Sequence, residues 1–225
     1  MRAHEILNEK SSRGRPVICV DVQPVYADYT PQGYEQKVAK FLSQQRGPIL
    51  MYVNADDTVS EDNIQNDIIP FWIEIFEDIG VDFYDVANEP STINYEGPIF
   101  DNMEWFDKGY GYFRTWMSIG IEDKYIIGVI REMYQQKIND SRELFGGDED
   151  KILDYLKPVA DSINTEANTL LDDPLSVGWV AVDHLKRYTN CYLIGGARDE
   201  CLKEVALLMN AFNIKYTMIN ELIYG

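Results

Sequence analysis

The chain has 225 residues, 45% of them apolar, which suffices for one substantial hydrophobic core. Its 20 basic and 38 acidic residues give a formal net charge of -18, which repels nucleic-acid phosphates, so we expect no nucleic-acid partner. No run of residues is apolar for long enough to cross a bilayer, and residues 1–15 lack the apolar region of a signal peptide. Three cysteines without an export signal favour a reducing, cytoplasmic setting and exclude a disulfide scaffold.

Strands and helices alternate along the first part of the chain. The run PVICVDV at residues 16–22 is β-prone throughout, which is typical of a strand buried on both faces of a parallel sheet. Apolar spacing and turn residues predict a helix at 34–45, a strand at 48–53, a helix at 67–78 and a strand at 82–86.

The middle of the chain is less regular, and the alternation returns near its end. Residues 89–117 are predicted as an aromatic loop, followed by helices at 122–136, 148–159 and 180–187. A strand at 191–194, a helix at 199–212 and a strand at 215–219 follow.

This alternation predicts an α/β fold, a three-layer doubly wound, mostly parallel sheet with helices on both faces. We expect an N-terminal arm at 1–15 and a single domain at 16–225, with an elaborated middle segment at about 89–186.

Polar residues follow the predicted strands at the edge where such sheets bind ligands. In open α/β sheets, that edge is formed by the carboxyl ends of the strands. The first strand ends at Asp21 and Gln23, and the strand at 191–194 runs into Gly195 and Gly196. The second and third strands are followed by Asn54, Asp56, Asp57, Asp85 and Glu89.

Cys201 lies in the first turn of a predicted helix, where the helix dipole and unpaired N–H groups favour a thiolate. The same N–H groups could hold an oxyanion during acyl transfer. A cysteine nucleophile needs a proton acceptor, yet His4 lies in the predicted arm and His184 in a predicted helix. Asp21 is therefore the best-placed base. The simpler interpretation makes Cys201 a packed helix residue and Asp21 a strand-end carboxylate that accepts backbone N–H bonds.

Two segments resemble isochorismatase-like cysteine hydrolases. The stretch GGARDECL at 195–202 is similar to the family element G-x-A-T-D-x-C-V, and Asp21-Val22-Gln23 is similar to its D-x-Q. The resemblance implies a hydrolase of a small amide, imide or enol ether, with Asp21 as base and Cys201 as nucleophile. It also implies backbone oxyanion donors at Gly196, Ala197 and Cys201, a cis Gly196–Ala197 peptide, and no cofactor.

The family triad is completed by a lysine, for which Lys108 in the stretch KGYGYF at 108–113 is the nearest match. We assign the substrate pocket to Gln23, Asn54, Tyr110 and Tyr112. The chain departs from the family pattern at two positions, since Arg198 and Val205 each replace a threonine. The sequence also resembles uncharacterised proteins encoded by large tailed phages, which implies no chemistry.

Two other functions stay open. Carboxylates at successive strand ends suit Mg²⁺ or Mn²⁺ in a phosphohydrolase or nuclease, with Asp21, Asp56, Asp57 and Asp85 as ligands. Alternatively, the chain is a catalytically inactive acidic interaction protein on the same scaffold, since its charge would attract a basic partner. We expect a small-molecule substrate and no membrane partner, and a homo-oligomer is left open.

Overall fold

The computed structural model describes residues 14–55, 62–81, 102–108, 114–138, 141–162, 164, 166, 168, 170 and 179–225. The chain forms two compact units. The first comprises Met1–Asp107, Asn190–Leu202 and Tyr216–Gly225, and the second comprises Lys108–Thr189 and Lys203–Lys215. Most of the expected arm at 1–15 lies outside the described residues, and the single-domain organisation stays a prediction.

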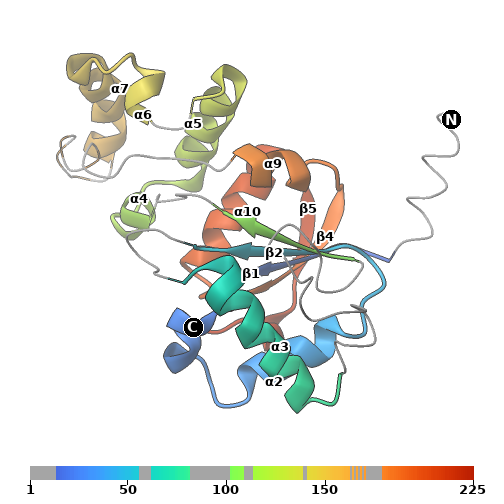
Figure 1. Ribbon diagram of the computed structural model, residues 1–225. Coiled ribbons are helices and arrows are strands. Elements are labelled where there is room, and N and C mark those ends of the chain that lie inside the picture. Colours follow the sequence, from blue (N-terminus) through green and yellow to red (C-terminus); the bar gives the residue numbers. More distant parts are fainter. Residues whose placement is uncertain are drawn as a thin grey trace, which may run out of the picture. The chain divides into compact units, whose positions relative to one another are not determined.

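Five parallel strands form one sheet in the order β3-β2-β1-β4-β5 (Figure 1). The strands are β1 (Val17–Val20), β2 (Ile49–Val53), β3 (Met103–Asp107), β4 (Asn190–Gly195) and β5 (Lys215–Met218). Strand β1 pairs with β2 on one side and with β4 on the other, so the direction of winding reverses beside β1. The predicted three-layer α/β fold with a parallel sheet is confirmed.

The α-helices are α2 (Tyr34–Leu42), α3 (Ile69–Asp78), α4 (Arg114–Ser118), α5 (Asp123–Gln136), α6 (Ser141–Leu144), α7 (Glu149–Ser162), α9 (Trp179–Leu185) and α10 (Cys201–Ala211). Short 3-10 helices are η1 (Pro24–Tyr29) and η4 (Asn220–Leu222), and η2 (Ile64–Ile68) is π-helical. Among the described residues, no helix has the length and apolar character needed to span a membrane.

The core of the first unit lies between the sheet and helices α2 and α3 (Figure 1). Val17 and Cys19 of β1 face this core, and because strand side chains alternate, Ile18 and Val20 face the other way. All four side chains are buried, which is why β1 reads as a continuous apolar run. Trp72 of α3 reaches back to the end of β1, where its indole N–H donates to the Val22 carbonyl at 3.0 Å.

The structure differs from the sequence-based elements mainly at β3, which lies inside the segment predicted as an aromatic loop. Strand β3 reads MEWFD, and its exposed Glu104 and Asp107 interrupt the apolar run that would have indicated a strand. It lies at the edge of the sheet, where β2 is its neighbour. The strand predicted at 82–86 lies outside the described residues.

In the second unit, the described part of the chain is helical, with apolar residues of α5 and α7 at helical spacing in its core. Trp116 is fully buried and its indole N–H donates to the Leu170 carbonyl at 3.2 Å. Arg131 of α5 donates to the Ala211 carbonyl at 2.7 Å, which satisfies an unpaired group at the end of α10.

Gly195 provides the first testable prediction, because its φ of +82° and its closeness to β1 both disfavour a side chain. A Cβ at this position would lie 2.4 Å from the Val20 carbonyl oxygen. Gly80 has a similar φ of +76°, but a Cβ there would meet nothing within 4 Å. Gly80→Ala therefore reports the cost of the backbone conformation alone, about 1–2 kcal/mol.

We expect Gly195→Ala to cost about 1–3 kcal/mol more than Gly80→Ala, because the steric clash adds to the backbone strain. Urea denaturation of both variants measures the difference. Equal losses of stability would show that β4 can move away from β1 without cost.

Candidate functional site

Asp21 directly follows β1 at the carboxyl edge of the sheet, beside the position where the winding reverses. Its side chain is fully buried, and its backbone N–H donates to the Tyr52 carbonyl at 2.8 Å, which extends the pairing of β1 with β2 by one residue. Its φ of +47° is uncommon for a residue other than glycine. Such backbone strain clusters at functional sites, where the surrounding structure holds it in place.

The loop from β4 to α10 forms the other side of the candidate site. Gly195 and Gly196 both have positive φ, of +82° and +56°, and turn the chain away from the sheet. The Ala197 carbonyl then accepts N–H bonds from Glu200 at 3.2 Å and from Leu202 at 3.1 Å. Helix α10 begins at Cys201, whose side chain is buried.

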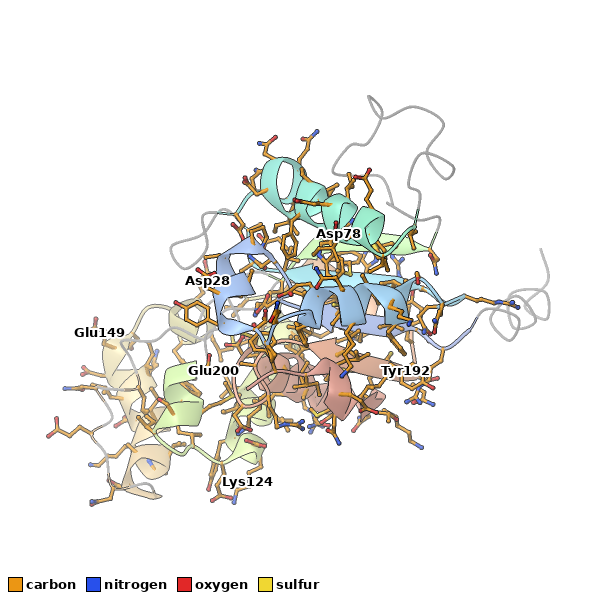
Figure 2. All side chains as sticks on the ribbon, turned by 90° about the horizontal axis from the view of Figure 1, so that it is seen from below. Asp28, Asp78, Lys124, Glu149, Tyr192 and Glu200 are labelled. Carbon is orange, nitrogen blue, oxygen red and sulfur yellow. The ribbon has the colours of Figure 1, made fainter. Side chains whose placement is uncertain are left out.

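Gly196 shows how closely the two sides approach each other. A Cβ at Gly196 would lie 3.4 Å from the Cβ of Cys201 and 3.5 Å from the carbonyl oxygen of Val20, the residue before Asp21. Figure 2 shows Asp28 and Glu200, on the segments after β1 and β4, at one end of the sheet, with Tyr192 toward the other. The end of β1 and the start of α10 therefore meet across a single glycine.

Gln23 and Asn54, both predicted to line a substrate pocket, are buried and bonded to each other. The Gln23 side-chain oxygen accepts the Asn54 backbone N–H at 3.0 Å, and its amide nitrogen donates to the Asn54 carbonyl at 2.8 Å. The same nitrogen donates to Asp62 at 3.1 Å, and Asn54 donates to the Tyr26 hydroxyl at 3.1 Å. These bonds tie the segments after β1 and β2 together, a role that the sequence did not indicate.

Lys108, the predicted third member of the triad, belongs to the second unit and forms a buried ion pair there. Its ammonium lies 3.2 Å from a carboxylate oxygen of Glu204, and both side chains are almost wholly buried. Glu204 was not among the predicted site residues. Its signal in the sequence is a single acidic residue within the apolar helix sequence CLKEVALLMNA of α10, a helix that is buried on several sides.

Five predicted site residues lie outside the described residues, namely Asp56, Asp57, Asp85, Tyr110 and Tyr112. Where the structure is described, no group of three or more His, Cys, Asp or Glu side chains is arranged to hold a metal ion. The alternative metal site therefore stays a prediction. The cis peptide implied for Gly196–Ala197 is wrong, since every described peptide bond is trans.

The two strand cysteines have environments that suppress thiolate formation. Burial raises the pKa of the Cys19 thiol far above its usual range, and the nearby Asp21 carboxylate adds to the effect. Burial also raises the pKa of Cys191 to about 11, although the Arg15 guanidinium partly opposes the shift. Both thiols are therefore neutral at physiological pH, as expected for packing residues.

The raised pKa of Cys191 predicts a loss of stability in alkaline solution. An unfolded thiol ionises near pH 8.5, whereas the folded Cys191 thiol ionises only at about 11, so rising pH favours the unfolded chain between these values. We expect the stability advantage of the wild-type chain over Cys191→Ala to shrink as the pH rises from about 8.5 to about 11. Urea denaturation at several pH values tests this, and a constant difference would contradict it.

The Lys108–Glu204 ion pair predicts a strong asymmetry between single and double substitutions. Glu204→Gln leaves a buried ammonium without its carboxylate, which should cost about 3–5 kcal/mol of unfolding free energy. Replacing both partners by apolar residues, as in Lys108→Met with Glu204→Leu, should recover most of that loss.

The exposed pair of Lys124 and Glu122 is the control, because its separation of 2.6 Å is short but solvent surrounds it. Glu122→Gln should therefore change stability far less than Glu204→Gln does. Denaturant unfolding of the three variants measures these effects. A Glu204→Gln loss as small as that of Glu122→Gln would mean that the Lys108 charge is solvated.

Comparison with protein-family models, curated proteins and solved structures found no match to this chain. The likeness to isochorismatase-like hydrolases therefore rests on residues 21–23 and 195–202 and on what the structure places around them.

Proposed function

We propose that the protein is a cysteine hydrolase of the isochorismatase-like type, acting on a small amide, imide or enol ether. Cys201 is the nucleophile and Asp21 the base. The observation that carries the proposal is the close packing around Gly196. A Cβ at Gly196 would lie within 3.5 Å of both the Cys201 Cβ and the Val20 carbonyl oxygen. The residue before Asp21 and the first residue of α10 thus both pack against Gly196, which supports the pairing of Asp21 with Cys201.

The strain and burial of Asp21 support this assignment. Its φ of +47° lies in the left-handed region, which is uncommon for residues other than glycine, and residues held in this way cluster at functional sites. The edge of the sheet supports it further, because ligands of open α/β folds bind where the winding reverses at the carboxyl ends of the strands.

For an amide substrate, the Asp21 carboxylate takes the Cys201 thiol proton while the sulfur forms a bond to the carbonyl carbon. The backbone N–H groups of Gly196, Ala197 and Cys201 stabilise the oxyanion that results. The carbon–nitrogen bond breaks when the leaving nitrogen takes the proton back from Asp21. Water then adds to the thioester carbon and gives a proton to Asp21. The carbon–sulfur bond breaks to release the acid, and the sulfur takes the proton from Asp21, which restores the thiol.

Lys108 would complete the triad by resemblance alone. Its ammonium is held by Glu204 at 3.2 Å, an arrangement that the resemblance does not imply. Asp21 and Cys201 both belong to the first unit, so the base and the nucleophile are proposed from residues of one compact body.

Alkylation by iodoacetamide tests the proposal without knowledge of the substrate. We expect Cys201 to react well below pH 8.5, whereas Cys19 and Cys191, whose pKa values are raised, stay unmodified. Asp21→Asn should slow the reaction of Cys201 at pH 7 by about tenfold or more, because the proton acceptor is lost. Mass spectrometry of the native protein after timed exposure gives the rate at each cysteine.

Asp28→Asn is the matched control, since Asp28 is an exposed carboxylate on η1, just after Asp21 in the same unit (Figure 2). It removes the same charge from a neighbouring position and should leave the rate unchanged. Should Cys201 react no faster than an ordinary thiol in the wild-type chain, the proposed chemistry is excluded.

A further inference from the structure

The C-terminal segment after β5 is bonded to the loop that carries the proposed oxyanion donors. Tyr224 forms a parallel bridge with Ala197. The Tyr224 N–H donates to the Gly196 carbonyl at 3.3 Å, and the Tyr224 carbonyl accepts the Arg198 N–H at 3.1 Å. The Gly196 carbonyl and the Arg198 N–H, which flank Ala197, are therefore both bonded to one residue of the segment after β5.

The bridge is itself held by helix α2. The Tyr34 hydroxyl donates to the Leu222 carbonyl at 3.0 Å, and the rings of Tyr34 and Tyr224 meet edge to face with centroids 5.3 Å apart. All three side chains are buried. Burial raises the pKa of the Tyr34 hydroxyl well above its usual range, so it remains a neutral donor. The segment is thus packed into the core of the first unit and is more than a loose tail.

The bridge determines which way the Ala197 backbone points. In a parallel pair, the groups that flank the bridging residue bond to the partner, and the residue's own N–H and C=O lie on the opposite edge. The Ala197 carbonyl does lie on that edge, since it accepts the N–H groups of Glu200 and Leu202 at the start of α10. The Ala197 N–H therefore faces the same edge as the first turn of α10, where Cys201 lies.

We propose that Tyr224 is a positioning residue, which through its bridge to Ala197 aims the Ala197 N–H at the reacting centre beside Cys201. This inference rests on the proposed hydrolase function and adds a residue that the resemblance does not imply. Tyr224 does not touch the substrate. It acts by fixing the Gly196–Arg198 backbone, so its loss should loosen this loop and leave the rest of the sheet intact.

A chain that ends at Ile223 tests the role of the bridge, because it lacks Tyr224 and Gly225. Amide hydrogen exchange should become faster at residues 196–202 but not in β1. The pH midpoint for iodoacetamide alkylation of Cys201 should rise by up to about one pH unit, since N–H groups that stabilise the thiolate are no longer aligned. The control is Tyr29→Phe, which removes the hydroxyl of an exposed tyrosine in the same unit and should behave as the wild type.

The outcomes separate the two proposals. An unreactive Cys201 in the wild-type chain overturns the proposed hydrolase, and the role of Tyr224 with it. A reactive Cys201 with the same exchange and the same pH midpoint in the truncated chain overturns only the role of Tyr224. If the truncated chain does not fold, Tyr34→Phe, which removes only the hydroxyl bonded to Leu222, should show the same changes to a smaller extent. An unchanged profile in that variant overturns the positioning role.

Discussion

The close approach of β4 to β1 is the constraint on which the candidate site depends. A Cβ at Gly195 would lie 2.4 Å from the Val20 carbonyl oxygen and 2.8 Å from the Val20 nitrogen, so this position requires glycine. Because Gly195 can pack directly against the β1 backbone, the next residues turn over the end of β1 and bring α10 to it. A bulkier residue would push β4 away from β1 at the point where the winding reverses. Asp21 and Cys201 would then also move apart.

The strain at Asp21 can persist because its neighbours are fixed in several independent ways. Its own N–H extends the pairing with β2, and the carbonyl of the next residue, Val22, accepts a bond from the Trp72 indole N–H. The Gln23 side chain is bonded to both the backbone N–H and the backbone carbonyl of Asn54. Each contact involves a buried group, whose hydrogen bond is costly to lose. An unfavourable φ of the order of 1–3 kcal/mol is therefore tolerated. The predicted pocket residues Gln23 and Asn54 thus hold the site in shape, whatever else they contact.

The sequence predicted the parts of the fold that depend on local pattern. Strand β1 and helix α5 lie within two residues of their predicted bounds, because a continuous apolar run or a helical spacing marks each of them. Strand β3 was missed, since its pairing with β2 compensates for charged residues that obscure its pattern. Two non-local contacts were also missed. No short-range sequence pattern specifies that Lys108 pairs with Glu204, 96 residues away, or that Tyr224 forms a backbone bridge with Ala197.

The three cysteines differ in the environments that their positions in the fold give them. Cys19 and Cys191 lie within strands, where burial raises their pKa values and no helix end offsets the loss of solvation. Cys201 is also buried, but it is the first residue of α10, where backbone N–H groups and the helix dipole favour negative charge. Packing of the Cys201 side chain alone would not require a strained backbone at Asp21. That strain costs free energy without adding apolar contact, and the proposed chemistry gives it a use.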